Sequence, residues 1–551
     1  KDENNSSILQ LLGTVYLQKK NYKLSERYFL KSFNIDPNNP ATINNLGILN
    51  KQNKKLDKAI NYFDINIKKN NFLNSWVNKS NILIENKRFE EGLQFSKNAL
   101  KKYPQDVKLR NNFAIFLFKC GFQNEALKIY QQFDEENLHF EDSFYNYSNI
   151  LIQINDLSKA LLITNKLILN NKKNLNGLHQ RHLIYKLLFD FTNAEIDILN
   201  SIKIDKLNFI SNKMLVELYI DYKKFDKALY YCELMIRNKI EEEFFGIKKI
   251  LCKINLGIWQ NLKQELEVFN KNFKYDSNSI NPLSLKYIND DPLIQKKFSE
   301  NYWKSKIKNP FLFNISSNVI RDKTSKIRIG YFSGDFTNHA VFHLIQDLFL
   351  NHDKSKFEIY AYSTFKKESS AREKIIKNVD YFYDIDKTSD EEIIKLVKSH
   401  SLDIAIDLSG YTVHNRSHLF EYNIAKIKIN YLGYPGTMGT KSYDYIIADK
   451  NIIPENQTKF YSENVIYLPE IYQPFSPIDF DLNVKRSAFG LPEDVFLFGS
   501  FSRIEKILPD VFNIWMNILK KYKDTYLALC INNQMIKNNI KEYCDENNFN
   551  F

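Results

Sequence analysis

The sequence predicts an α-helical repeat array followed by an α/β region built on a parallel, doubly wound sheet. Two observations carry this fold class. Related segments recur every 33 or 34 residues through the first half of the chain, and a fixed period of this length is typical of a solenoid of helix pairs. From residue 326 onward, short β-rich runs alternate with amphipathic helical segments, which is the pattern of parallel strands joined by crossover helices.

The repeat is visible in nine-residue segments such as KLDKAINYF, FQNEALKIY and KFDKALYYC, which share one small residue. The small residues are Ser25, Ala59, Gly92, Ala126, Ala160, Ala194 and Ala228. We expect helices to pack closely at this position, and Pro37 and Pro104 to follow the ends of second helices, because proline cannot continue a helix. The array is expected over about residues 4–240, with 241–273 as a degenerate last pair, so that residues 1–273 form one domain.

A solenoid of this kind leaves a concave groove that suits an extended peptide. Asparagines recur on the first helices of successive repeats, namely Asn44, Asn45, Asn78, Asn81, Asn111 and Asn112. Amides on a concave face can hydrogen-bond a peptide backbone without reading its side chains. Solvated helix faces explain the same asparagines equally well. A role for the array in spacing or homodimerisation is the alternative to the binding of a protein or peptide, which we favour.

After the repeats, residues 274–323 lose the period and are expected to form irregular connecting structure with short helices. An α/β lobe follows over residues 324–488. Its strands are predicted at 326–333, 357–363, 380–385, 402–408, 427–432, 443–448 and 465–468, and its first helices at 342–351, 369–379 and 389–400.

A second unit opens at residue 489 with the order strand, helix, strand, helix and runs to residue 551. Two strands and two helices are too few to close a doubly wound domain, so we expect this second lobe to be incomplete in the printed sequence. The chain begins with Lys1 rather than Met, and we expect its native N-terminus to lie further upstream.

Polar residues follow the first predicted strand, in the segment DFTNH at 335–339. In an open α/β sheet, ligands bind beyond the carboxyl ends of the strands, where a helix N-terminus also presents free N–H groups. His339 can serve there as a hydrogen-bond donor, a general base or a phosphate contact. The alternative is that Asp335 or Asn338 simply caps the next helix and that His339 is a surface residue.

Further polar clusters follow other predicted strands. Asp407, Ser409 and Thr412 come directly after a buried strand. A glycine-rich loop, LGYPGTMG at 432–439, lets a ligand approach backbone N–H groups, although it lacks the Walker spacing and is equally typical of a tight turn. Lys506 precedes a predicted helix and could bind a diphosphate as a point charge, whereas a solvated surface lysine is the plainer interpretation.

Composition excludes several other classes of protein. Lys and Arg exceed Asp and Glu by 77 to 65, for a net charge of +12, but the basic residues are spread along the chain and form no nucleic-acid stripe. The five cysteines show no Cys-x-x-Cys spacing, so we expect neither a disulfide framework nor a zinc site. No apolar run approaches the ~20 residues that span a bilayer. We expect a soluble, cytoplasmic protein that binds neither nucleic acid nor membrane.

The ordered set of motifs resembles the tetratricopeptide-linked O-linked N-acetylglucosamine transferases and their SPINDLY-like relatives. The matching segments are DFTNH (335–339), KFEIYAYS (356–363), DLSGYT (407–412), LGYPGTMG (432–439), YDYIIAD (443–449), YSENVIYLP (461–469) and FSRIEKILP (501–509). The resemblance implies tetratricopeptide repeats and a catalytic region of the glycosyltransferase B type, with two Rossmann-like lobes of which the second is incomplete. Ala340 stands where the animal enzymes carry proline, which leaves the acceptor class open. Arg503 occupies a position that is glutamine in the animal enzymes.

The resemblance also implies an inverting, metal-independent transfer of N-acetylglucosamine from UDP-N-acetylglucosamine to Ser or Thr of a protein. The UDP-sugar is then a substrate, and no cofactor is expected. By the match of motifs, His339 and Asp407 are expected as catalytic residues, and Leu432, Gly433, Pro435, Thr437, Arg503 and Lys506 as contacts to the donor sugar and diphosphate. A related transferase using UDP-glucose, GDP-fucose or an Asn acceptor, or a peptide-binding scaffold with an inactive catalytic half, remains as an alternative.

Overall fold

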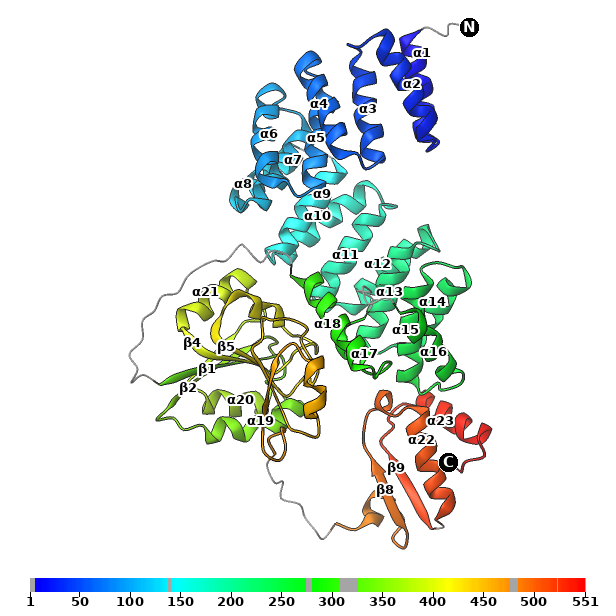
Figure 1. Ribbon diagram of the computed structural model, residues 1–551, viewed down its shortest axis with the longest axis vertical. Helices are drawn as coiled ribbons and strands as arrows, with labels where there is room; N and C mark the ends of the chain where they lie inside the picture. Colours follow the sequence, from blue (N-terminus) through cyan, green and yellow to red (C-terminus); the bar gives the residue numbers. More distant parts are fainter. Residues whose placement is uncertain are drawn as a thin grey trace. The chain divides into compact units, whose positions relative to one another are not determined.

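The computed structural model describes residues 5–136, 140–273, 280–307, 326–475, 484–522 and 524–550. The chain divides into two compact units, residues 1–204 and 205–551. Each unit is described by itself below. Helical repeats lead into a parallel sheet region along the chain (Figure 1), so the predicted fold class is confirmed. Within the described ranges, no helix is both long and apolar enough to cross a bilayer.

The first unit consists of six antiparallel helix pairs. Its helices are α1 (Ser6–Gln18), α2 (Tyr22–Ile35), α3 (Pro40–Gln52), α4 (Leu56–Asn70), α5 (Leu73–Glu85), α6 (Phe89–Lys102), α7 (Val107–Lys119), α8 (Gln123–Glu135), α9 (Glu141–Gln153), α10 (Leu157–Asn170), α11 (Leu175–Leu187) and α12 (Phe191–Ile204). Several begin at a short polar residue, because its side chain accepts a free backbone N–H of the first turn, as Asn39, Asp106 and Asn174 do. The second helices α2 and α6 end just before Pro37 and Pro104, as predicted.

The shared small residue of each repeat lies at a helix-to-helix contact. All seven of these residues, from Ser25 to Ala228, are buried. A Cβ atom added at Gly92 would lie 2.0 Å from the ring of Phe116 in the next repeat. The period therefore marks the closest approach of neighbouring helices, as the sequence predicted.

The second unit opens with two further helix pairs, α13 (Phe209–Asp221), α14 (Phe225–Arg237), α15 (Glu242–Leu256) and α16 (Leu262–Asn272). Two more helices follow, α17 (Pro282–Leu285) and α18 (Pro292–Lys306). The connecting region was expected to hold only short helices, but α18 is 15 residues long. It is stable because its two sides are buried in different cores, Phe298 against α15 and Trp303 against the sheet. The rest of the predicted connecting region, 274–279 and 308–323, lies outside the described residues.

The sheet has seven parallel strands in the order β3-β2-β1-β4-β5-β6-β7. The strands are β1 (Ile327–Ser333), β2 (Phe357–Ser363), β3 (Tyr381–Asp384), β4 (Leu402–Asp407), β5 (Ala425–Asn430), β6 (Tyr445–Ala448) and β7 (Asn464–Tyr467). The helices between them are α19 (Ala340–Asn351), α20 (Ser370–Asn378) and α21 (Asp390–His400), and short 3-10 turns η1 (Ser417–Tyr422) and η2 (Glu455–Phe460) follow β4 and β6. Each predicted strand and helix of this lobe is present, with ends shifted by no more than two residues.

Alternate side chains of the central strand β1 enter two different cores. Tyr331 of β1 packs with α19 and α20 on one face, whereas the next residue, Phe332, packs with α21 and η1 on the other. This alternation is the two-residue period of a strand with both faces covered. The sheet is therefore a sandwiched, doubly wound layer (Figure 1).

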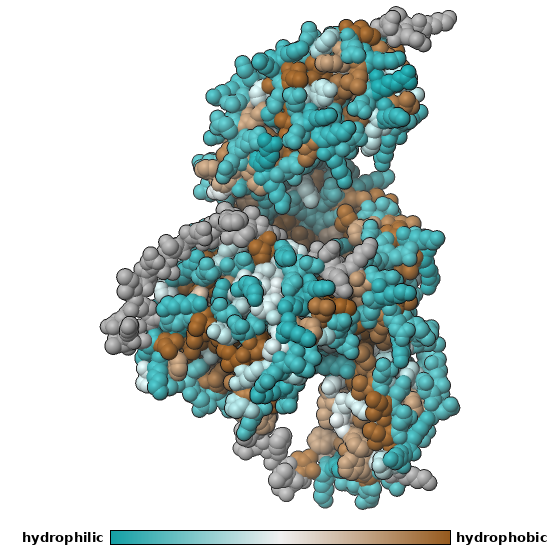
Figure 2. Space-filling view, in the orientation of Figure 1, coloured by the Kyte–Doolittle hydropathy of each residue, from teal (hydrophilic) through white to brown (hydrophobic). Residues whose placement is uncertain are grey.

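The C-terminal segment forms a smaller parallel pair of strands with two helices. Its elements are η3 (Arg486–Phe489), β8 (Phe496–Ser500), η4 (Ile504–Lys506), α22 (Pro509–Lys521), β9 (Thr525–Leu529) and α23 (Gln534–Glu546). Phe512 and Ile540 pack with Trp259 and Leu262 near α15 and α16, so the segment shares a core with the last repeat helices. Apolar surface remains exposed on the segment (Figure 2), and such surface is typical of a packing or interaction face.

Candidate functional site

The strand order places a topological switch point between β1 and β4. The chain passes from β1 to β2 on one side and from β4 to β5 on the other. In open α/β sheets, the crevice beyond the carboxyl ends of the strands at such a point is where ligands bind. The residues there belong to the β1 loop (334–339) and the β4 loop (408–412), and the β5 loop (432–439) follows the neighbouring strand. These three loops carry the motifs expected to form the site.

The three loops are in close contact. The backbone N–H of Gly334 donates to Oγ of Ser409 at 3.2 Å, which joins the β1 loop to the β4 loop. A Cβ atom at Gly433 would lie 2.0 Å from the carbonyl oxygen of Leu408. Because only glycine allows that approach, the β5 loop can lie directly against the β4 loop. The structure therefore brings the polar loops that follow β1, β4 and β5 together at one edge of the sheet.

His339 occupies the N-terminus of α19. It is itself the N-cap residue, and its Nδ1 accepts the backbone N–H of Val341 at 3.3 Å. The alternative that Asp335 or Asn338 caps this helix is therefore wrong. Asn338 Oδ1 lies 2.7 Å from Nε2 of His343. The imidazole of His339 is half-exposed, so a ligand bound at the three loops could reach it.

Asp335 lies behind His339 and is mostly buried. Its Oδ1 is 3.5 Å from Nδ1 of His339. Burial raises the pKa of the Asp335 carboxyl, and nearby His339 opposes that rise. Asp335 therefore forms the inner partner of the exposed imidazole.

Asp407 is enclosed rather than presented to a ligand. Its Oδ1 accepts the backbone N–H groups of Ser409 and Gly410 at 2.9 and 3.0 Å. Its Oδ2 accepts the hydroxyls of Ser417 and Tyr443, both at 2.6 Å. With four donors and only 2 % of its surface exposed, Asp407 holds the β4 loop in shape. This geometry favours a positioning role over direct contact with a reacting atom.

The first residue of the β5 loop has unusual backbone geometry. Leu432 has φ +71°, and Gly433 N–H donates to the carbonyl of Tyr431 at 3.0 Å. This bond and this φ are typical of the rare classic γ-turn. The side chain of Leu432 is buried in the core against α19, whereas Pro435 is exposed. Of the residues expected at the donor sugar, Gly433 and Pro435 are thus accessible to a ligand. Leu432 could contact a ligand only through its backbone.

Glu463 is a site residue that sequence reasoning missed. Its carboxylate accepts the hydroxyl of Thr437 at 2.7 Å and the backbone N–H of Met438 at 2.6 Å. Thr437 Oγ1 in turn accepts the N–H groups of Gly439 and Ser462 at 3.1 and 3.0 Å. Burial raises the pKa of the Glu463 carboxyl. Thr437 was expected to contact the sugar, but its hydroxyl is bonded inside the protein. We refer to the bonds from Thr437 and Met438 to the Glu463 carboxylate as the Glu463 clamp.

Two more residues beside the three loops carried no signal in the sequence. His414 has φ +60° and stacks on Phe365 with ring centroids 3.9 Å apart. A Cβ atom at Gly334 would lie 2.9 Å from Cβ of His414. Asn430 donates to the carbonyls of Tyr434 and Gly436, both at 3.1 Å, and so supports the β5 loop from inside the protein.

Glu463, unlike these two residues, could have been found from the sequence. The motif YSENVIYLP places its carboxylate directly before a strand.

Arg503 and Lys506 lie in the C-terminal segment. Both side chains are exposed, and the guanidinium of Arg503 pairs with the carboxylate of Glu505 at 2.5 Å. Lys506 ends the short turn η4, three residues before α22 begins at Pro509. Across the described ranges, no hydrogen bond or ion pair joins either side chain to the β1, β4 or β5 loop. Their role at a diphosphate stays a prediction.

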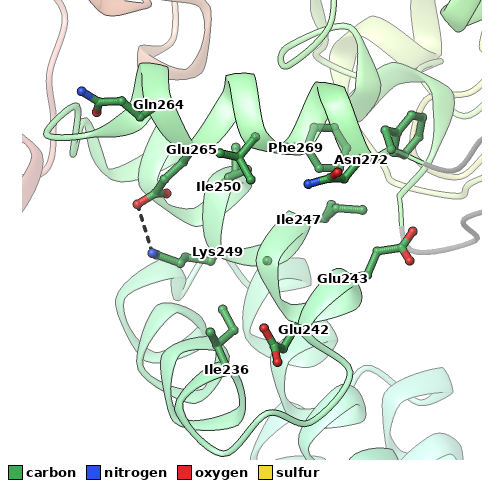
Figure 3. A pocket seen from close by; sticks show the side chains of 13 residues that line it. Ile236, Glu242, Glu243, Ile247, Lys249, Ile250, Gln264, Glu265, Phe269 and Asn272 are labelled. Atoms are coloured by element: carbon green, nitrogen blue, oxygen red, sulfur yellow. Dashed lines mark hydrogen bonds and ion pairs between the residues drawn. The ribbon is translucent and has the colours of Figure 1, made fainter.

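A hollow of about 640 Å³ lies elsewhere, between α15 and α16 (Figure 3). Apolar residues such as Ile247 and Phe269 line it, and Glu242 and Glu243 lie at its edge. The ion pair between Lys249 and Glu265, 3.0 Å apart, lies beside it. None of its lining residues belongs to the motifs that define the three loops. This hollow is therefore not part of the candidate site.

The asparagines of the first repeats form a ladder. The Nδ2 of Asn78 donates to Oδ1 of Asn44 at 3.0 Å, and that of Asn112 donates to Oδ1 of Asn81 at 2.7 Å. Asn45 donates to the hydroxyl of Thr14 at 3.1 Å. The first bond joins residues one repeat apart, 34 positions along the chain, whereas the other two join residues 31 positions apart on neighbouring repeats. The amides are thus prearranged in a row, and each keeps capacity for a further hydrogen bond.

The described residues include no group of three or more His, Cys, Asp or Glu side chains placed to hold a metal ion.

Helical repeats and a doubly wound parallel sheet with a loop cluster at its switch point define a repeat-linked α/β protein. Comparison with known proteins gives two family matches. Residues 304–474 match the model of glycosyl transferase family 41, and residues 6–39 match a tetratricopeptide repeat. The chain is thus similar to glycosyl transferase family 41 over the sheet lobe and to tetratricopeptide repeats at its first two helices.

Among similar curated proteins, the probable UDP-N-acetylglucosamine–peptide N-acetylglucosaminyltransferase SEC of Arabidopsis thaliana is 33% identical over 212 residues. That match covers 37% of this chain and 22% of the relative. The SPINDLY protein of the same plant is 28% identical over 204 residues, with 36% and 22% covered. The chain thus aligns with about a fifth of the length of these relatives.

A solved structure of a Thermobaculum terrenum O-GlcNAc transferase mutant is also similar, with 16% identity and a TM-score of 0.47. That likeness covers 74% of this chain and 72% of the other. It is too loose to assign a role to any residue.

Proposed function

We propose that this protein transfers N-acetylglucosamine from UDP-N-acetylglucosamine to Ser or Thr hydroxyls of protein acceptors. The observation that carries the proposal is the meeting of the β1, β4 and β5 loops at the switch point, with the imidazole of His339 presented at the N-terminus of α19. The family 41 match spans all three loops. The two plant relatives, whose names carry this activity, support the choice of sugar and nucleotide.

The chemistry would be a single displacement with inversion. The acceptor oxygen forms a bond to C1 of the sugar and gives up its proton to the His339 imidazole or to water, while the bond from C1 to the diphosphate oxygen breaks and its electron pair leaves with UDP. Negative charge therefore grows on the diphosphate. The free N–H groups and partial positive charge of the α19 N-terminus, together with Lys506 and Arg503, would stabilise that charge without a metal ion.

Some of these residues would contact the substrates, and others would hold the loops in place. His339 would face the acceptor hydroxyl or the donor. Gly433 and Pro435 would contact the sugar, because they are the accessible parts of the β5 loop. Asp407 and Thr437 would hold the β4 and β5 loops in place from inside. The asparagine ladder would bind the backbone of a protein acceptor through its remaining hydrogen-bond capacity.

The test is transfer of radiolabelled sugar from UDP-N-acetylglucosamine to protein in a cell extract, using full-length protein. His339→Ala should abolish most transfer while thermal melting falls only slightly, because the loss of an N-cap costs about 0.5–2 kcal/mol and the half-exposed ring contributes little to a core. His343→Ala is the matched control, since His343 is also exposed on α19. Equal transfer by all three proteins would refute the role of His339. Equal labelling from UDP-glucose or GDP-fucose would refute the choice of donor.

A further inference from the structure

The last helix pair of the repeats, α15 and α16, leaves a hollow of about 640 Å³ between its helices (Figure 3). The small residue that lies at the helix contact in the preceding repeats is replaced here by Leu262, which is 34 residues after Ala228. A leucine occupies more volume than the small side chains do, so neighbouring helices cannot approach as closely at this position. The sequence thus gives a physical reason for the hollow.

The walls of the hollow are mostly apolar. Ile247 and Ile250 of α15 are buried beside it, whereas Val268 of α16 is 61 % exposed. Gly246 adds no side chain, and a Cβ atom placed there would meet nothing within 4 Å. The volume lies within the range of about 300–1,000 Å³ in which proteins bind ligands. Exposed apolar surface of this kind is typical of an interaction site.

Unpaired negative charge lies at the edge of the hollow. Lys249 and Glu265 form an ion pair beside it, and Glu265 also pairs with Lys253, each at 3.0 Å (Figure 3). Glu242 and Glu243 line the hollow from the first turn of α15, and within the described ranges neither has an ion-pair partner. The helix N-terminus stabilises both carboxylates, but it does not explain the apolar surface next to them. In a chain of net charge +12, this edge favours a ligand that is both apolar and positively charged.

We propose that the hollow binds a segment of a partner protein in which apolar side chains lie next to a Lys or Arg. The apolar side chains would contact Ile247, Val268 and Phe269, and the cation would pair with Glu242 or Glu243. Phosphate-bearing ligands such as nucleotides and phospholipids are disfavoured, because their negative charge would meet these two carboxylates. A groove lined by two helices is also a common docking surface for a peptide segment. The site is separate from the three loops, so this proposal does not depend on sugar transfer.

Selection from a displayed library of random short peptides tests the site without assuming a sequence. The full chain is the immobilised target, and clones are kept only if they lose binding to Gly246→Phe. The added ring starts in open space and would fill the hollow, and circular dichroism checks that the variant folds. Gly246→Ala is the matched control and should bind the kept clones as the unchanged protein does. Val268→Trp blocks the hollow from α16, and it decides the question if Gly246→Phe does not fold, because Val268 is largely exposed.

The kept clones should share apolar residues next to a Lys or Arg. Titration with a synthetic peptide of such a clone should show about tenfold weaker binding when Glu242 and Glu243 are both changed to Lys, because surface ion pairs are replaced by repulsion. Glu241→Lys is the control, because Glu241 directly precedes this turn and does not line the hollow. Failure to obtain clones that distinguish the blocked variant from Gly246→Ala would overturn the proposal. Clones rich in Asp or Glu, or equal weakening by Glu241→Lys, would also overturn it.

Discussion

Removal of the Glu463 clamp should loosen the β5 loop measurably. In Glu463→Ala, the hydroxyl of Thr437 and the N–H of Met438 lose their acceptor, and both residues are buried, with 5 % and 0 % of their surfaces exposed. Each buried polar group left without a partner costs about 1–3 kcal/mol. The variant also no longer has to bury the Glu463 carboxyl, whose pKa is raised by burial, and this gain offsets part of the cost. We expect local opening to become easier by about 2 kcal/mol.

Hydrogen exchange measured by mass spectrometry is the assay. A change of about 2 kcal/mol corresponds to roughly 30-fold faster exchange of the amides of residues 437–439. Glu455→Ala is the control, because Glu455 pairs with Lys450 at the surface and such pairs contribute only about 0–1 kcal/mol. Unchanged protection of the β5 loop in Glu463→Ala, at exchange rates equal to those of the control, would refute the clamp.

Three further predictions follow from close contacts and charge. Gly433→Ala would bring a Cβ atom to 2.0 Å from a carbonyl of the β4 loop, so we expect the free energy of unfolding to fall by about 1–3 kcal/mol and little sugar transfer. Gly246→Ala in α15 is the control, because its Cβ would meet nothing within 4 Å, and it should melt no lower than the unchanged protein. Gly92→Ala would meet an aromatic ring at 2.0 Å, and calorimetry should show a lower melting transition for the repeats. Because the pKa of Glu463 is raised on folding, its contribution to stability is full below its unfolded value near 4.5 and is lost as the pH rises through the folded value. The difference in unfolding free energy between the unchanged protein and Glu463→Ala should therefore shrink as the pH rises, and a difference that grows would contradict this sign.

The elements of the sheet lobe could be predicted from the sequence because each strand is a short apolar run bounded by polar turns. Strand β4 is a clear case, with 402–408 predicted and Leu402–Asp407 found. The helix after β1 was predicted from residue 342, but it begins at Ala340. The difference arises because His339 caps the helix with a ring nitrogen, and histidine is not among the usual capping residues.

The meeting of the polar loops could be predicted from the sequence, whereas the residues that hold those loops in place could not. Strand ends of a parallel sheet share one edge, so polar loops that follow them must lie near one another. Which carboxylate reaches a reacting group and which holds a loop depends on contacts between distant residues. Asp407 was expected to be catalytic, yet it meets Tyr443, 36 residues away. Glu463 meets Thr437, 26 residues away. Neither hydrogen bond can be recognised from the sequence pattern around its residues.

The β5 loop shows why such supports matter for function. Leu432 at φ +71° has a strained backbone, and strain of this kind costs about 1–3 kcal/mol and persists only where the surroundings hold it. Here the surroundings are the buried side chain of Leu432, the Glu463 clamp and the amide of Asn430. The accessible parts of the loop, Gly433 and Pro435, are therefore held in position before any ligand arrives. The transfer proposed above would require donor and acceptor to be held in one orientation, and a loop fixed from inside would meet that need without using the binding energy of the donor.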